Sequence, residues 1–132
     1  MAGGLQVEVV AADRMVWSGE ASMVSARTVD GDIGVLRGHT PVLSLLAPSV
    51  VEITADSGRP VVASVDGGFI SVAKDRVSIL SEHIWLGQEV DTAQARADLD
   101  AARSEAGANA EFDPAVRWAQ ARLDAAAKAS RA

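Results

Sequence analysis

Hydrophobic and polar residues alternate in short runs along the first two thirds of the chain. Leu5, Val7 and Val9 alternate with two polar residues, a period of two that predicts a half-buried strand. Similar apolar runs follow, separated by turn sequences: residues 15–17, 23–29, 42–46, 50–54, 61–65, 69–72 and 77–80. Many short strands with no helical period between them predict a β-sandwich or a small barrel.

From residue 88 the spacing of apolar residues becomes helical. Asp91 is placed to cap a helix, with Gln94 at the capping-box position, and Gly107 is placed to end it. Asp113 followed by Pro114 is typical of the start of a second helix. The predicted apolar stripes are narrow: Ala95, Leu99, Ala102 and Ala106 in the first helix, and Val116, Ala119, Leu123 and Ala126 in the second.

The composition divides at the same point. Residues 1–87 contain 33 large apolar side chains (Val, Ile, Leu, Met, Phe, Trp), whereas residues 88–132 contain six of them and 16 alanines. We therefore predict an α+β fold, in which residues 1–87 form a β-sandwich or small-barrel domain and residues 88–132 form a two-helix hairpin domain. Burying a Leu or Val contributes roughly 1.5–3 kcal/mol and a methyl group about 0.8 kcal/mol. Because the hairpin has few large side chains to bury, we expect it to dock on another surface and to do so reversibly. The alternative is an ordinary, well-packed pair of helices.

The charge and the chemistry of the side chains exclude several classes of protein. The 18 acidic residues outnumber the 12 basic ones, which argues against nucleic-acid binding. The chain has no cysteine, and its two histidines, His39 and His83, are too far apart in sequence for a local metal motif. No serine lies in a nucleophile-elbow pattern, and no apolar run approaches the ~20 residues of a membrane-spanning helix. We expect no catalytic residue, metal, cofactor or membrane insertion.

One segment, Asp30–Pro41, combines glycines with alternating charged and apolar residues. We predict a long ordered loop, in which Gly31, Gly34 and Gly38 occupy turn positions that need a positive φ. Loops of this kind often carry function, and a plain connector is the alternative.

Three stretches of the sequence together resemble one known family. They are Gly31–Leu43 (GDIGVLRGHTPVL), Val65–Val72 (VDGGFISV), and Val77–Glu82 (VSILSE) followed by Gln88–Asp91 (QEVD). Their order and spacing resemble the epsilon subunit of F-type ATP synthases over nearly the whole chain. The resemblance implies an antiparallel β-sandwich of about ten strands at 1–87, followed by an antiparallel hairpin of two helices at 88–132.

The resemblance also implies a function. Such a subunit is a non-catalytic part of the rotating central stalk of a proton-translocating enzyme, peripheral on the cytoplasmic face of the cell membrane. Its sandwich packs against the gamma subunit and the polar loops of the c-ring. Its hairpin moves between a folded state and an extended state that reaches the alpha and beta subunits, where it suppresses ATP hydrolysis. The alternative is a free-standing β-sandwich that binds a small ligand, with the helices as a lid.

Particular residues take their expected roles from this resemblance. Asp32 and His39 correspond to the c-ring-facing edge, with Arg37 and Gly38 between them; Arg37 stands where the family usually has proline. The basic residues of the second helix are expected to face acidic surfaces of the beta subunits: Arg117, Arg122, Lys128 and Arg131.

Some members of the family bind ATP through an Ile/Leu-Asp-x-x-Arg-Ala pattern. This chain has Val90-Asp-Thr-Ala-Gln-Ala95, which keeps Asp91 and Ala95 but replaces the arginine with Gln94. A neutral amide does not supply the positive charge that fixes a phosphate. We therefore predict weak or absent ATP binding.

Overall fold

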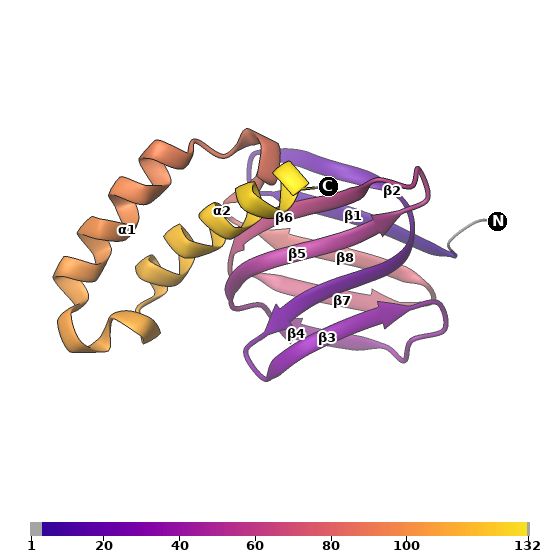
Figure 1. Cartoon of the computed structure of the whole chain (residues 1–132). Helices are drawn as coiled ribbons and strands as arrows, with labels where there is room; N and C mark the ends of the chain where they lie inside the picture. Colours follow the sequence, from indigo (N-terminus) through magenta and orange to yellow (C-terminus); the bar gives the residue numbers. More distant parts are fainter. Residues whose placement is uncertain (1–3, 132) are drawn as a thin grey trace.

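The computed structural model describes residues 4–131; residues 1–3 and 132, at the outer ends of the two predicted domains, lie outside it. The described residues form nine strands followed by two α-helices (Figure 1). The strands are β1 (Leu5–Ala11), β2 (Arg14–Thr28), β3 (Gly31–Leu36), β4 (Val42–Leu45), β5 (Pro48–Ala55), β6 (Pro60–Asp66), β7 (Phe69–Ala73), β8 (Arg76–Ser81) and β9 (Ile84–Leu86). The helical part consists of the 3-10 helix η1 (Gly87–Glu89), α1 (Thr92–Ala106), the 3-10 helix η2 (Gly107–Phe112) and α2 (Pro114–Arg131).

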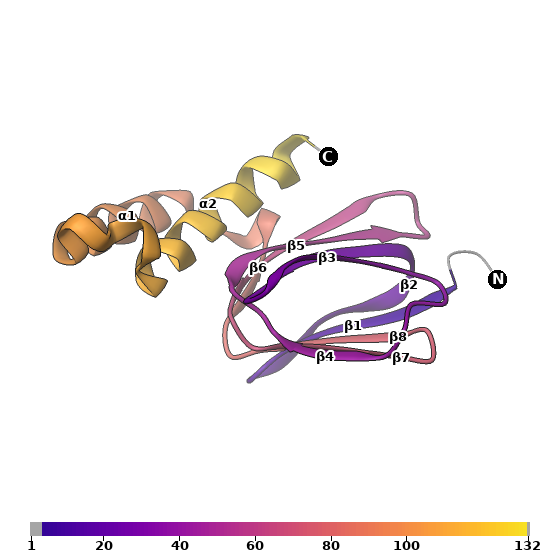
Figure 2. The same cartoon turned by 90° about the horizontal axis from the view of Figure 1, so that it is seen from below.

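The strands form two layers that β2 joins. The first part of β2 pairs with β1, and its second part pairs with β3 and β5. One layer has the order β4-β7-β8-β1-β2 and the other the order β3-β2-β5-β6-β9. Figure 2 shows the two layers edge-on. The predicted sandwich is confirmed, and among the described strands the pairing is antiparallel except between β1 and β8.

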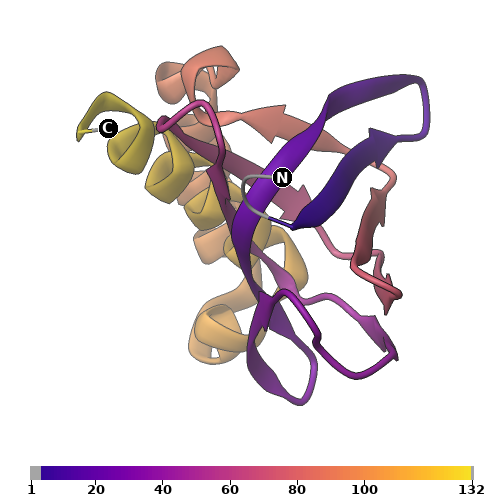
Figure 3. The same ribbon diagram turned by 90° about the vertical axis from the view of Figure 1, so that its right-hand side faces the viewer.

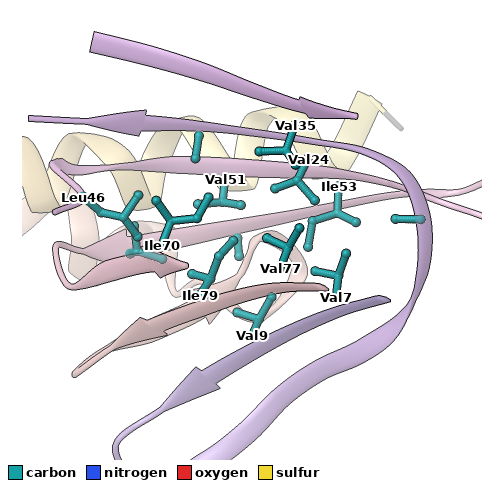
Figure 4. Packing of buried hydrophobic residues seen from close by; sticks show 14 of the residues in the cluster. Val7, Val9, Val24, Val35, Leu46, Val51, Ile53, Ile70, Val77 and Ile79 are labelled. Carbon is teal, nitrogen blue, oxygen red and sulfur yellow. The ribbon is translucent and has the colours of Figure 1, made fainter. Parts of the chain in front are cut away.

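The hydrophobic core lies between the layers, because alternate residues of each strand point inward. In β1, Leu5, Val7 and Val9 are buried while the residues between them face outward. Figure 4 shows β-branched side chains from both layers meeting in this core: Val7, Val9, Ile70, Val77 and Ile79 from one layer, and Val24, Val35, Val51 and Ile53 from the other.

The structure corrects two predictions about the strands. Residues 15–17 and 23–29 belong to the single strand β2, because Ser18 and Gly19 between them continue the pairing with β1. The segment 30–41 is not one long loop, because β3 occupies half of it and buries Val35. Glycine was the misleading signal.

The three glycines of that segment differ in conformation. Gly31 and Gly38 have positive φ angles of 131° and 84°, as predicted. The prediction for Gly34 is wrong, since Gly34 lies within β3, pairs with Ser25 of β2 and does not have a positive φ. The connection between β3 and β4 is therefore only residues 37–41.

The predicted helix ends are confirmed. The Asp91 carboxylate accepts the Gln94 N–H at 3.0 Å, and Gly107 ends α1 with a φ of 60°. The Asp113 carboxylate accepts the backbone N–H groups of residues 115 and 116. The capping-box prediction is wrong, because the Gln94 side chain donates instead to Asp98 at 2.8 Å, one turn further along α1.

Helix α2 lies between α1 and the sandwich (Figures 1 and 2). One face buries Val116 and Ala119 against Leu99 of α1, as the predicted stripes require. A second face, which the sequence analysis did not predict, buries Ala121 and Ala125 where α2 meets β5, β6 and η1. The hairpin therefore contacts the sandwich mainly through small side chains of α2.

Helix α2 also approaches η1 closely, at Gly87. A Cβ atom placed at Gly87 would lie 2.4 Å from the Ala125 carbonyl oxygen and 2.5 Å from the Ala129 Cβ. Both distances are far below van der Waals contact. The absence of a side chain at Gly87 is what permits α2 to dock where it does.

Candidate functional site

The four residues predicted to face the c-ring lie along one edge of the sandwich. In the described sheet β3 pairs only with β2 and β4 only with β7, so both are edge strands, and Figures 1 and 3 show them at the lower edge of the molecule. Asp32 lies near the start of β3, whereas Arg37, Gly38 and His39 follow its end. Five residues of strand place Asp32 roughly 16 Å from Arg37. The structure thus brings the four residues to one edge but not into one cluster.

The Asp32 end of this edge carries an exposed ion pair. The Asp32 carboxylate accepts from the Arg27 guanidinium at 2.9 Å, across the β2–β3 pair. Both side chains are largely in solvent, so the pair contributes about 1 kcal/mol or less to stability. Its charges are therefore available to a partner with polar groups.

The other end of the edge is fastened to the turn between β7 and β8. The Gly38 N–H donates to the Asp75 carboxylate at 2.7 Å, and the His39 N–H donates to the Leu36 carbonyl at 3.1 Å. The His39 ring lies close to the backbone of the next residue, with Nδ1 2.6 Å from the Thr40 carbonyl oxygen. The connection is thus held in place on both sides, and the exposed Arg37 beside it presents a positive charge.

The four basic residues of the second predicted helix do not share one face of α2. At 100° per residue, Arg117, Lys128 and Arg131 fall within an arc of about 60°, and Arg122 lies about 140° from Arg117. The Lys128 ammonium pairs with Glu52 of β5 at 3.0 Å. The Arg117 guanidinium lies 5.9 Å from the Phe112 ring centre, and Arg131 is exposed at the end of the helix.

Arg122 points toward α1 and is mostly buried, with 14% of its side chain exposed. Its guanidinium donates to the Asp98 carboxylate at 2.9 Å and lies 5.0 Å from the Trp118 ring centre. Its Nε is buried without a hydrogen-bond partner among the described residues. In this conformation Arg122 joins the two helices and does not face outward.

The residues that align with the ATP pattern have structural roles at the start of α1. Asp91 caps the helix, and Ala95 is completely buried. The Gln94 side chain donates to Asp98, which also accepts from Arg122. The hydrogen bond from Gln94, followed by that from Arg122, holds the pKa of Asp98 below its ordinary value.

An apolar row that the sequence pattern did not predict lies on the outer face of the first layer. In register across β4, β7, β8, β1 and β2 lie Leu45, Phe69, Leu80, Val10 and Met15. Four of them are 43–53% exposed. The helices pack on the opposite layer, and no other described element covers this face (Figure 2). The available signal was apolar residues at positions where the period of two predicts polar ones.

An ionic clamp that was also missed joins the start of β2 to η1. The Arg14 guanidinium binds both carboxylate oxygens of Glu89 at 3.2 and 3.3 Å and donates to the Ile84 carbonyl at 3.2 Å. The Glu89 carboxylate also accepts the Leu86 N–H at 3.0 Å. The hydrogen bond from Arg14 lowers the pKa of Glu89. The clamp fixes the segment that leads into α1 against the sandwich.

A serine, an aspartate and a histidine meet where the β6–β7 and β8–β9 turns lie together. The Ser81 hydroxyl and the His83 ring both bind the Asp66 carboxylate at 2.7 Å, so the histidine is not placed to activate the serine. Partial burial raises the pKa of Asp66, but the hydrogen bonds from Ser81 and His83 outweigh it and the net pKa is lowered. The hydrogen bond to Asp66 raises the pKa of His83. The trio ties two turns together and lacks the relay of a catalytic triad.

An open groove of about 720 Å³ separates α2 from the β2–β3 part of the sandwich. Its lining carries both signs of charge, including Arg27 and Asp32 on one side and Arg117 and Lys128 on the other. Within residues 4–131 no group of acidic residues and histidines is arranged to hold a metal ion. No described helix is both long and apolar enough to cross a membrane.

Comparisons with known proteins agree with this arrangement. The family model for the ATP synthase, Delta/Epsilon chain, beta-sandwich domain matches residues 4–87. The ATP synthase epsilon chain of Streptomyces avermitilis is 50% identical over 117 residues, which cover 89% of this chain and 94% of the relative. That of Corynebacterium diphtheriae is 45% identical over 120 residues, covering 89% and 98%. A chain in the OSCP/F1/c-ring part of the Euglena gracilis mitochondrial ATP synthase matches with a TM-score of 0.72 at 24% identity, covering 94% of this chain and 78% of that chain. This last likeness concerns the fold.

Proposed function

The chain belongs to the ATP synthase delta/epsilon family, and from this premise we propose that it is a non-catalytic rotor subunit of a proton-translocating F-type ATP synthase. In this role it couples rotation of the c-ring to the catalytic head through gamma, and its C-terminal helices inhibit ATP hydrolysis. The observation that carries the proposal is the uncovered apolar row on the first layer, in a chain that is half identical to epsilon chains over most of their length. A row of this kind marks a protein interface.

The gamma subunit is the proposed partner of the apolar row. Leu45, Phe69 and Leu80 are neighbours in register on one face of the sheet and are each about half exposed. Covering them in a permanent complex stabilises the assembly by removing apolar surface from water. The helices lie on the other layer, so the hairpin is able to move without disturbing this contact.

The c-ring is the proposed partner of the β3–β4 edge. Asp32, Arg37 and His39 present both signs of charge and an imidazole along this edge, which suits the polar loops of a membrane-embedded ring. Such contacts contribute little affinity each but fix orientation and partner choice. The chain then lies peripherally on the cytoplasmic face of the membrane.

The hairpin is the proposed regulatory unit, acting on the alpha and beta subunits. We place the division between a sandwich domain, 1–87, and a hairpin domain, 88–132, at the Gly87 contact. The hairpin meets the sandwich through Ala121, Ala125 and the Lys128–Glu52 pair. Contacts of this size permit reversible release. Extension presents the basic residues of α2 to acidic surfaces of the head.

The test is whether the protein travels with a large membrane ATPase in a fresh lysate, and whether the apolar row holds it there. We expect Phe69→Ser combined with Leu80→Ser to weaken binding to gamma at least tenfold while leaving the fold intact. Met23→Ser, which changes an exposed residue on the opposite layer, is the matched control. Solitary migration of the native protein would instead favour the free-standing ligand-binding module.

A further inference from the structure

Two of the four basic side chains that were expected to meet a partner are bound by acids of this chain. The Lys128 ammonium lies 3.0 Å from the Glu52 carboxylate of β5, and the Arg122 guanidinium lies 2.9 Å from the Asp98 carboxylate of α1. One contact joins α2 to the sandwich and the other joins α2 to α1. The two contacts lie on different sides of α2. Release of α2 from the sandwich breaks the Lys128 contact, and separation of α2 from α1 breaks the Arg122 contact.

The contact at Arg122 belongs to a small network. One Asp98 oxygen accepts from the Gln94 amide at 2.8 Å and the other accepts from Arg122. The Trp118 ring lies under the same guanidinium at 5.0 Å. A guanidinium that is mostly buried, paired and stacked in this way is fixed in one direction. Arg122 is therefore unavailable to any surface outside the hairpin.

We infer that Asp98 and Glu52 are internal substitutes for an acidic partner surface, and that they hold the cations of α2 while the hairpin is folded down. A cation that is paired within the chain does not at the same time pair with the head. Docking of α2 on the sandwich therefore withholds Lys128, and packing of α1 against α2 withholds Arg122. This inference rests on the proposed inhibitory function for its consequence in the enzyme. The two ion pairs, Asp98–Arg122 and Glu52–Lys128, form what we call the latch, and the latch itself involves only this chain.

Few apolar contacts hold the hairpin beside the two ion pairs, so the ion pairs are important for keeping it folded. Between the two helices the buried apolar side chains are Leu99, Val116 and Ala119, and toward the sandwich they are alanines. Two charged hydrogen bonds are a substantial share of such an interface. Their removal is expected to change the equilibrium between open and folded hairpin, whereas it leaves the core of the sandwich untouched.

The experiment uses the absence of cysteine in the chain. Spin labels are attached to Ser57→Cys, in the exposed β5–β6 turn, and to Ser104→Cys, on the exposed side of α1. Pulsed electron resonance then measures the distance between them across a urea series below the unfolding of the sandwich. At the urea concentration where half of the unmodified hairpin is open, Asp98→Asn with Glu52→Gln is expected to raise the ratio of open to folded hairpin about tenfold.

Two controls make the result specific. Asp100→Asn removes an acid from an exposed position of α1 that has no side-chain hydrogen bond to a described residue, and it is expected to leave the distances unchanged. In an Arg122→Gln background, Asp98→Asn is expected to add nothing, because Asp98 acts through Arg122. An unchanged distance distribution in the Asp98→Asn, Glu52→Gln variant would overturn the latch, as would an equal response to Asp100→Asn.

A second arm uses the assembled enzyme. If the freed cations bind the head, the same double variant is expected to hydrolyse ATP at least threefold more slowly than the unmodified enzyme. A longer distance between the two spin labels with an unchanged rate of hydrolysis would confirm the latch and contradict the inhibitory function. Faster hydrolysis would contradict the inference that the freed cations bind the head. Unchanged distances would reject the latch whatever the hydrolysis rate.

Discussion

The sandwich and the helical hairpin are held together by different kinds of contact. The sandwich buries β-branched and leucine side chains between two layers, whereas the hairpin buries mostly alanines and adds charged hydrogen bonds at Arg122 and Lys128. Apolar packing of large side chains is strong and independent of partners. Charged contacts at a small interface are weaker and are exchangeable for similar contacts elsewhere. The chain thus combines a stable sandwich with a helical hairpin that can detach from it.

The largest expected effect on stability comes from truncating one buried side chain in each region. Ile70 is completely buried in the sandwich, and Ile70→Ala should lower its free energy of unfolding by about 2–5 kcal/mol. Leu99→Ala, at the centre of the hairpin contact, should release the helices and leave the sandwich transition in place. Urea unfolding followed by amide exchange in β1 and α1 separates the two results. A common loss of protection in both regions would show that they form one cooperative unit.

A smaller effect is expected where the two regions touch. Gly87→Ala introduces a Cβ that would lie 2.4 Å from the Ala125 carbonyl, and overpacking of this kind costs about 1–3 kcal/mol. The variant should undock α2 and leave the sandwich folded, which the spin-label distance between residues 57 and 104 reports. The matched control is Gly34→Ala, because its added Cβ would meet only the Met23 side chain at 3.6 Å. An undisturbed hairpin in Gly87→Ala would refute the close contact.

The regions should also differ slightly in their response to pH. Because Asp66 raises the pKa of His83, the stabilisation from this pair is complete below the ordinary histidine pKa and is lost as pH rises through the raised one. The loss should be about 0.5 kcal/mol or less, since His83 is largely exposed. It should appear in the sandwich transition as pH rises above the ordinary histidine pKa, and it should disappear in His83→Asn.

The hairpin should show no such change in that range. The pKa of Asp98 is lowered, so the Asp98–Arg122 contact is complete above the ordinary aspartate pKa and weakens only as pH falls through the lowered value. Hairpin opening that increases as pH rises above the ordinary histidine pKa, in the unmodified chain and in the Asp98→Asn variant alike, would contradict this expectation.

The smallest expected signal is that of ATP. Gln94 supplies no positive charge, and its amide is already engaged by Asp98. Isothermal titration of the whole chain with Mg-ATP should give no binding in the low micromolar range. A dissociation constant in that range would show that cations elsewhere, such as those of the groove beside α2, replace the missing arginine.

The two-region architecture was predictable from the sequence, but several contacts were not. The capping of α1 by Asp91 and of α2 by Asp113 follows from local chemistry, and the structure confirms both. The length of β2 was hidden because Gly19, which is typical of turns, lies within the strand. The parallel pairing of β1 with β8 depends on residues some 70 positions apart, which no local pattern records.

The candidate site was predictable only in part for similar reasons. The positions of Asp32 and His39 on one edge require the pairing of β3 with β2 and the course of the connection to β4. The division of the basic residues of α2 was available from helical geometry, which separates Arg122 from the other three. Its acceptor on α1, Asp98, was not, because that contact depends on how the two helices pack.

We propose above all that a fixed sandwich carries a releasable inhibitory hairpin. The decisive measurement is the rate of ATP hydrolysis by the assembled enzyme when this chain ends after Val90. This truncation removes both helices but keeps Glu89, and with it the clamp to Arg14. We expect faster hydrolysis than in the enzyme with the full chain, with unchanged assembly. Hydrolysis at the same rate in a fully assembled enzyme would contradict it.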